Sequence, residues 1–273
     1  MFVSYNFRII AEHDFGLSYA NRGFQYNDGF FETLIWHQGK IRFLDDHLDR
    51  IKRAMQVLSL TQLPQLTASF LQTEANALIR QNTLDTESIR IKINIWRESG
   101  GLFTPESEEA EILITVAPQQ PFPAVIGQAD FYTGLPNRFT PFSFFKGPYA
   151  LHYVQASLAK KKAGLDELIL LDEQKNISEC LVSNIFWIKN NQVFTPSLES
   201  GCIAGIMRLN VLRACQMLKI EVWEGFYTKS DLYAAEAVFT SNVTGLRPIL
   251  YIGQKQFATN HPLVMQIEQL VLA

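Results

Sequence analysis

The chain has 273 residues, of which 47% are hydrophobic and 19% are charged, the balance of an ordinary globular protein. This length is enough for two domains with a cleft between them. The formal net charge of -3 provides no basic excess for a phosphate backbone or an anionic bilayer, so we expect no nucleic acid and no membrane as partners.

The apolar runs are strand-sized, and the first residues, MFVSYNFRIIAEHD, reach charged positions quickly. The sequence therefore predicts neither a membrane span nor a secretory signal, and a cytoplasmic location is expected by default. Cys180, Cys202 and Cys215 are widely spaced and form no CxxC pair. This favours reduced thiols in the core over a disulfide framework or a zinc site.

The first half of the chain predicts a mixture of strands and helices. Apolar residues recur at three- and four-residue steps over 44–60, which is the pattern of an amphipathic helix. Isoleucines alternate with other side chains over 88–96, which is the period of a half-buried strand. The other elements expected here are strands at 30–37, 39–44 and 111–118 and a helix at 67–82.

A domain boundary is predicted near residue 120, because the segment APQQPFPAV (117–125) is rich in proline and poor in charge. We expect a smaller N-terminal α+β domain over 1–119 and a larger C-terminal domain over 120–273. The expected fold class is α+β (mixed α/β) in two unequal lobes. The elements expected in the second half are strands at 167–172, 184–188, 192–196, 221–227, 236–242 and 248–253, and helices at about 149–163, at 206–219 and at the C-terminus.

Lys146 has the most unusual surroundings in the chain. It lies in PFSFFKGPY (141–149), among three phenylalanines, two prolines and a tyrosine, with no acidic residue in the stretch. Desolvation lowers the pKa of a lysine, so that its free amine can act as a nucleophile or base, as Schiff-base chemistry requires. A lysine whose stem packs on rings while its ammonium reaches water fits the same sequence.

Small residues at Gly201, Ala204 and Gly205 lead directly into the helix expected from Ile206. Unpaired backbone amides at a helix start carry positive charge and bind phosphate groups. Many ordinary helices also begin after a glycine, so this signal alone predicts an anion site only weakly.

Two charged side chains are further candidates. Glu179 follows a turn and precedes an apolar strand, where a carboxylate could bind a protonated ring nitrogen, although a solvent-facing glutamate fits as well. Arg50 lies one turn after His47 on the first long helix. Arginine suits bidentate phosphate binding, but an ion pair with Asp46 or Asp49 explains it equally.

Taken together, these residues resemble the class IV family of pyridoxal-phosphate enzymes (fold type IV), which contains branched-chain and D-amino-acid aminotransferases and aminodeoxychorismate lyase. The resemblance runs through most of the chain and implies a two-domain fold like that of D-amino-acid aminotransferase, a pyridoxal 5'-phosphate cofactor and a homodimer. Its motifs are RGFQYNDGFFET (22–33), FLDDHLDRI (43–51), Lys146, Glu179, GIMR (205–208) and TSNVTGLRP (240–248).

The resemblance implies a role for each site residue. Lys146 would hold the cofactor in a Schiff base and then move a proton, and Glu179 would pair with the pyridine nitrogen so that the ring accepts electrons. The residues implied for the cofactor phosphate are Arg50, Ile206, Met207, Ser241 and Asn242.

Within the family, the GIMR and GLRP runs resemble those of the lyase. We therefore expect a lyase that converts 4-amino-4-deoxychorismate to 4-aminobenzoate and pyruvate, in folate synthesis. The first alternative is a class IV aminotransferase acting on branched-chain or D-amino acids, because one lysine serves both reactions. A non-catalytic cofactor carrier or regulatory relative is the second alternative. The presence of both Lys146 and Glu179 speaks against it, because a carrier needs no electron sink.

Arg97, at the end of the predicted strand, is the candidate for binding substrate carboxylates, by resemblance to an arginine-containing loop of the family. A surface arginine paired to Glu98 or to another acid fits as well. Asn27 replaces a usual glycine, and we expect its turn to survive because asparagine tolerates left-handed backbone. A metal-dependent hydrolase is disfavoured because no paired ligand spacing occurs among His13, His37, His47, His152 and His261.

Overall fold

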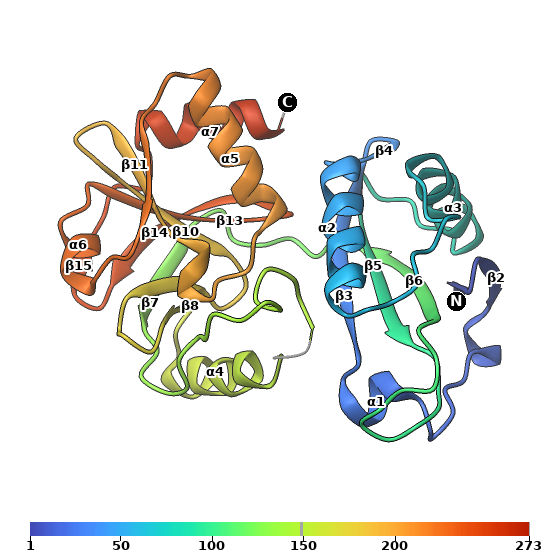
Figure 1. Ribbon diagram of the computed structural model, residues 1–273. Helices are drawn as coiled ribbons and strands as arrows, with labels where there is room; N and C mark the ends of the chain where they lie inside the picture. Colours follow the sequence, from blue (N-terminus) through green and yellow to red (C-terminus); the bar gives the residue numbers. More distant parts are fainter. Residues whose placement is uncertain (148–149, 273) are drawn as a thin grey trace. The chain divides into compact units, whose positions relative to one another are not determined.

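The computed structural model, which describes residues 1–147 and 150–272, divides into two units (Figure 1). Unit 1 comprises Met1–Pro121 and the segment Phe145–Pro148, and unit 2 comprises Phe122–Phe144 and Tyr149–Ala273. Each unit contains a sheet with helices packed on it, so the expected α+β class is confirmed. The predicted domains, 1–119 and 120–273, stay a prediction. In the structure the segment that carries Lys146 groups with unit 1.

Unit 1 is built on a six-stranded antiparallel sheet with the order β2-β1-β6-β5-β3-β4. Helix α2 packs on β3, helix α3 packs on β1 and β6, and the two helices contact each other, so they cover the same face. The elements are β1 (Phe2–Tyr5), β2 (Arg8–Ala11), the 3-10 turn η1 (Glu12–Asp14), α1 (Arg22–Tyr26), β3 (Gly29–His37), β4 (Lys40–Ile41), α2 (Leu44–Val57), α3 (Ala68–Gln81), β5 (Ser88–Arg97) and β6 (Ala110–Pro118).

The core of unit 1 follows the two hydrophobic periods in the sequence. The alternating isoleucines of β5 are buried, and so are Leu48, Ile51 and Met55 on the facing side of α2. Helix α2 ends at Val57, short of the predicted residue 60, because Ser59 adopts a left-handed backbone with φ 52°.

Unit 2 is built on a nine-stranded mixed sheet with the order β12-β11-β10-β13-β14-β7-β8-β9, with β15 paired to β14. Helix α4 packs on β8, and α5 and α7 lie side by side (Figure 1). The elements are β7 (Ile126–Phe131), α4 (Ala150–Ala163), β8 (Glu167–Leu171), β9 (Ile177–Cys180), β10 (Asn184–Lys189), β11 (Gln192–Pro196), η2 (Leu198–Ser200), α5 (Ile206–Met217), β12 (Val222–Gly225), α6 (Lys229–Tyr233), β13 (Ala237–Asn242), β14 (Gly245–Ile252), β15 (Lys255–Gln256) and α7 (Pro262–Leu272).

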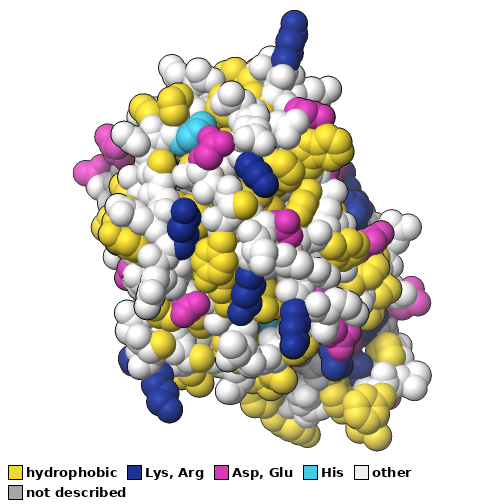
Figure 2. Space-filling view, turned by 90° about the vertical axis from the view of Figure 1, so that its left-hand side faces the viewer, with side chains coloured by type: hydrophobic (Ala, Val, Ile, Leu, Met, Phe, Trp, Pro, Cys, Tyr) yellow, Lys and Arg dark blue, Asp and Glu magenta, His cyan; other side chains and the backbone are white. Residues whose placement is uncertain are grey.

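One side of the surface carries charged and hydrophobic side chains intermixed (Figure 2). Figure 2 shows one side of the molecule, on which Lys and Arg side chains are scattered among hydrophobic and acidic ones. Of the helices in residues 1–147 and 150–272, none is both long enough and apolar enough to cross a bilayer.

Candidate active site

Lys146 is fixed against strand β3 through its backbone. The amide of Phe31 donates a hydrogen bond of 2.9 Å to the carbonyl of Lys146, and the two residues form an antiparallel bridge. The rings of Phe30 and Phe145 meet edge to face, with centroids 5.5 Å apart. The Lys146 ammonium lies 6.0 Å from the centroid of the Phe31 ring, so β3 adds an aromatic neighbour to those in the sequence stretch.

Gly147 permits this close approach. A Cβ atom at residue 147 would lie 2.8 Å from both the Gly29 carbonyl oxygen and the Phe30 Cα, and backbone atoms cannot move aside cheaply. The Asn27 side chain donates to the Gly147 carbonyl at 3.1 Å. Asn27 itself has φ 54°, which confirms that asparagine keeps the left-handed turn where the family usually has glycine.

A buried ionic cluster lies between β3 and α2. Glu32, His47 and Arg50 are 2%, 1% and 5% exposed. Arg50 Nε donates to Glu32 Oε1 at 2.9 Å, and its Nη2 donates to Oε2 at 2.8 Å, while His47 Nδ1 lies 2.8 Å from Oε1. The sequence offered Asp46 or Asp49 as the partner of Arg50. The structure shows that Arg50 binds Glu32, a carboxylate from the neighbouring strand.

The electrostatics of this cluster reach Lys146. Burial raises the pKa of Glu32, but the charges of Arg50 and Lys146 and the hydrogen bond from His47 outweigh burial and lower it to about 2. Burial lowers the pKa of His47, with further lowering by Arg50 and Lys146 against an opposing effect of Glu32. Glu32 is therefore an anion and His47 is neutral at neutral pH. The sequence stretch around Lys146 has no acidic residue, and the carboxylate that acts on it electrostatically comes from strand β3.

In unit 2, Glu179 lies within β9 and is 2% exposed, which contradicts the solvent-facing alternative. Its Oε1 accepts hydrogen bonds from Asn137 Nδ2 at 3.0 Å and Tyr153 Oη at 2.5 Å, and its Oε2 accepts one from the Ile203 amide at 3.1 Å. Burial, followed by the charge of Glu179, raises the pKa of Tyr153 well above its ordinary value. The phenol therefore stays a donor, and Glu179 is held as a carboxylate.

The orientation of Asn137 is fixed by the groups around it. Its amide nitrogen also donates to Ser178 Oγ at 2.9 Å, which leaves Oδ1 facing His152 Nε2 at 3.1 Å. His152 must then carry its proton on Nε2. Neither Asn137 nor Tyr153 was expected from the sequence, because each lies far from Glu179 along the chain and carries no motif of its own.

Helix α5 begins at Ile206, the residue predicted, and no side chain caps its N-terminus. Its N-cap, Gly205, is closely approached: a Cβ atom there would meet Asn184 Oδ1 at 2.1 Å. Asn184 is paired with Ser241 across β10 and β13. The hydroxyl of Ser241 is buried without a hydrogen-bond partner among the described residues. Uncapped helix amides and an unpaired buried hydroxyl fit a phosphate group.

The phosphate candidates differ in how their side chains are engaged. Asn242 Oδ1 accepts from the amide of Thr244 at 2.9 Å and from its hydroxyl at 2.6 Å, which closes a local turn. Met207 is buried in the first turn of α5 and offers its backbone amide. Arg50 lies in unit 1, whereas Ser241, Asn242 and the start of α5 lie in unit 2. Their common role in binding phosphate stays a prediction.

Arg97 is buried, which contradicts the surface alternative for this arginine. Its Nε donates to Asp28 at 3.0 Å, and its terminal nitrogens donate to the carbonyls of Leu58, Ser59 and Ser107 at 2.5, 3.1 and 3.3 Å. These bonds tie together three segments of unit 1. The role of Arg97 in binding substrate stays a prediction, and the geometry supplies a structural role for it.

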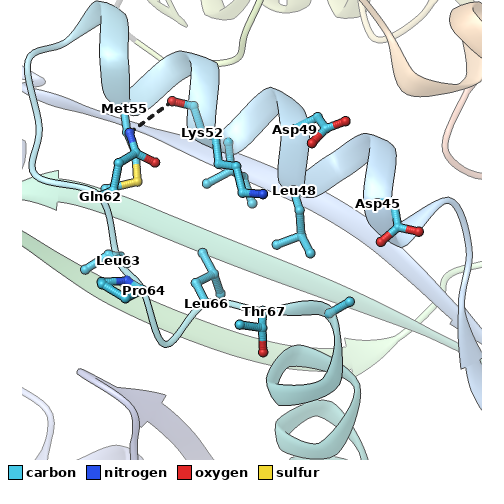
Figure 3. Close-up of a pocket in the computed structure, with 12 residues that line it drawn as sticks. Asp45, Leu48, Asp49, Lys52, Met55, Gln62, Leu63, Pro64, Leu66 and Thr67 are labelled. Atoms are coloured by element: carbon cyan, nitrogen blue, oxygen red, sulfur yellow. Dashed lines mark hydrogen bonds between the residues drawn. The ribbon is translucent and has the colours of Figure 1, made fainter.

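A pocket of about 520 Å³ lies between α2 and the segment that leads into α3 (Figure 3). Leu48 points into it, and Gln62 closes one end by donating to the Lys52 carbonyl at 3.2 Å. None of the predicted site residues lines this pocket, so its size does not mark it as the active site.

Comparison with known proteins agrees with the resemblance. Residues 29–252 match the family model described as amino-transferase class IV. The chain is 26% identical to the aminodeoxychorismate lyase of Bacillus subtilis (strain 168) over 263 residues, covering 93% of this chain and 87% of that one. It is 24% identical to the D-alanine aminotransferase of Listeria innocua over 277 residues, covering 94% and 90%.

Comparison of the fold with solved structures also agrees with the resemblance. The branched-chain aminotransferase of Thermoproteus uzoniensis superposes with a TM-score of 0.87 at 23% identity, covering 100% of this chain and 93% of that one. The expected fold type IV architecture is confirmed. The chain therefore belongs to the class IV aminotransferase family, whose members are pyridoxal-phosphate-dependent enzymes.

Proposed function

We propose that this enzyme is a lyase that converts 4-amino-4-deoxychorismate to 4-aminobenzoate and pyruvate, a step of folate synthesis. The observation that carries the cofactor chemistry is Glu179, a buried carboxylate held ionised by three donors. The preference for the lyase is supported by the GIMR and GLRP runs and by the similarity to the Bacillus subtilis lyase.

Each site residue would have a defined task. The bound cofactor supplies an electron sink for the electrons released when a C–H bond beside the substrate nitrogen breaks. Lys146 Nζ would hold the cofactor aldehyde and, once displaced by the substrate amine, would take that proton. Glu179 would keep the ring nitrogen protonated. The bond between the ring carbon and the enolpyruvyl ether oxygen would then break, so that enolpyruvate leaves with that oxygen, takes up a proton and becomes pyruvate, and the ring is left aromatic. The groups that would hold the phosphate are Arg50, the amides of Ile206 and Met207, and Ser241 with Asn242.

The substrate carries two carboxylates and needs a cation, and Lys92 is better placed for this than Arg97. The Lys92 ammonium lies 4.7 Å from the centroid of the Phe31 ring, the ring that Lys146 approaches to 6.0 Å. Because both nitrogens lie near the same ring, the distance between them cannot exceed these two distances added together. Lys92 is partly exposed, whereas the nitrogens of Arg97 are engaged with Asp28 and backbone carbonyls. We propose Lys92 as a substrate-carboxylate ligand.

The test is to incubate the cofactor-loaded protein with enzymatically generated aminodeoxychorismate and to follow 4-aminobenzoate and pyruvate together. Equal release of both products, lost in Lys146→Ala, is expected. An aminotransferase is the second candidate, favoured by the similarity to the D-alanine and branched-chain enzymes. Amino-group exchange between an amino acid and a keto acid, without 4-aminobenzoate, would identify that activity. Binding of cofactor without either reaction would identify a carrier.

We also propose a homodimer in the cytoplasm, as the family resemblance implies. The free, buried state of Cys180, Cys202 and Cys215 is compatible with a reducing compartment. Sedimentation analysis of the cofactor-loaded protein tests the oligomeric state: a dimer mass is expected, and a monomer at micromolar concentration would contradict it.

A further inference from the structure

Glu32 is a buried carboxylate to which the proposed reaction assigns no step. It follows Phe31, the residue whose amide binds the Lys146 carbonyl, and it lies on β3 with its side chain turned to α2. The segment around Lys146 is thus docked on the same strand that carries this anion. Lys146 acts electrostatically on both Glu32 and His47.

Glu32 accepts hydrogen bonds from one charged group, the guanidinium of Arg50, and from one neutral group, the imidazole of His47. Arg50 binds the carboxylate through Nε and Nη2, which fixes the plane of the guanidinium. His47 contributes its Nδ1 to the same oxygen, Oε1, and as a neutral imidazole it must donate there. The cluster therefore holds one anion, Glu32, which binds the cation Arg50 directly and interacts electrostatically with Lys146.

We propose that Glu32 is a positioning residue of the cofactor site, which holds the guanidinium of Arg50 in a fixed orientation and supplies the negative charge that acts on the amine of Lys146. This inference rests on the proposed roles of Lys146 and Arg50. It adds a function for an acidic residue that does not touch the reacting atoms.

The effect of the Glu32 charge on the amine of Lys146 can be measured without cofactor. A nearby anion favours the ammonium form of a lysine, so its removal lowers the pH at which the amine becomes reactive. Among the described groups, Glu32 on β3 and His47 on α2 interact electrostatically with Lys146, Arg50 on α2 binds Glu32, and Lys92 on β5 lies near the same Phe31 ring. Only Glu32 among these four is an anion.

The experiment is trace acetylation of the apo-protein with acetic anhydride over a range of pH, with the extent of modification at Lys146 measured by mass spectrometry. In Glu32→Gln, the half-point of the titration is expected to fall by about one pH unit, equivalent to about tenfold faster labelling below the half-point. Glu111→Gln is the matched control. Glu111 also lies in unit 1 and accepts bonds from Tyr5 and Trp96, and its change should leave the half-point in place.

An unchanged half-point in Glu32→Gln, or an equal shift in Glu111→Gln, would overturn the proposal. If Glu32→Gln does not fold, Glu32→Asp separates the two roles, because it keeps the charge but shortens the reach to Arg50. Its half-point should stay near that of the unchanged protein, while cofactor affinity measured by spectral titration falls about tenfold, as loss of a charged hydrogen bond predicts. A shifted half-point with unchanged affinity would contradict this.

The labelling experiment uses neither cofactor nor substrate. Its result therefore tests the role of Glu32 separately from the proposed lyase activity. If the half-point shifts in Glu32→Gln but the unchanged protein releases no 4-aminobenzoate, the role of Glu32 is supported and the proposed lyase activity is wrong.

Discussion

Arg97 and Lys92 lie on the same strand, β5, but their surroundings assign them different roles. The guanidinium of Arg97 donates hydrogen bonds to one carboxylate and to three backbone carbonyls. Lys92 rests on the face of the Phe31 ring. Burial, with a contribution from Arg90, lowers the pKa of Lys92, which leaves a cation that gains from pairing with an anionic substrate.

Substitution of the two residues should therefore have opposite effects on binding and stability. Lys92→Met is expected to lower kcat/KM for the dicarboxylate substrate about 10- to 100-fold, chiefly through KM, because a charged hydrogen bond is lost. Its urea unfolding should be nearly unchanged. Arg97→Met should reduce the free energy of unfolding by about 3 kcal/mol, because Asp28 and three carbonyls lose their donor. If Arg97→Met keeps its free energy of unfolding but has a raised KM, Arg97 rather than Lys92 would be the residue that binds the substrate carboxylate.

Ser241 gives a second prediction at the scale of a single residue. Its buried hydroxyl makes no hydrogen bond within the described part of the chain, so Ser241→Ala should change stability by less than about 0.5 kcal/mol or raise it slightly. Cofactor affinity should fall about 3- to 10-fold, since a phosphate ligand is removed. Both are measured on the apo-protein, by urea unfolding and by spectral titration. Unchanged affinity would exclude Ser241 from the phosphate site.

Among the elements, the short segment that carries Lys146 depends on close packing against β3. The bridge between Phe31 and Lys146, the Asn27 bond to Gly147 and the Phe30–Phe145 ring pair hold it in place. At Gly147 the backbone of β3 lies so close that a Cβ atom would have no room.

Gly147→Ala should push this segment away from β3, because the added methyl group would lie 2.8 Å from backbone atoms. We expect cofactor affinity to fall at least about tenfold, since small misplacement of a reacting group is costly. Gly16→Ala is the control, because nothing lies within 4 Å of a Cβ atom there and its stability and affinity should match those of the unchanged protein. Equal affinity of the two variants would contradict the docking role of Gly147.

The sequence predicted those elements whose periodicity is long and regular. Helix α2 and strand β5 were found because their apolar residues repeat over many positions and bury one face. Strands β1, β2 and β7 and helix α1 were missed. Strands β1 and β2 are a short local hairpin that pairs with the distant strand β6, and β7 pairs with β14, which is also far along the chain. Helix α1 has only five residues and is capped by Asn21. The start of α5 was found because glycine precedes it.

At the scale of the whole molecule, the sequence identified the residues that resemble the family but not their partners. Lys146 and Glu179 stand out through motifs, whereas Glu32, Asn137 and Tyr153 become neighbours of the site only after strands and helices have packed. The central claim of the proposed function is that Lys146 holds the cofactor.

The most direct test is to reduce the cofactor-loaded protein with sodium borohydride, digest it and locate the phosphopyridoxyl group by mass spectrometry. Reduction turns the bond between the cofactor and its lysine into a stable amine, so the modified residue is read directly. We expect the phosphopyridoxyl group on Lys146 and its absence in Lys146→Ala. A phosphopyridoxyl group on another lysine, such as the neighbouring Lys92, with Lys146 unmodified, would contradict it.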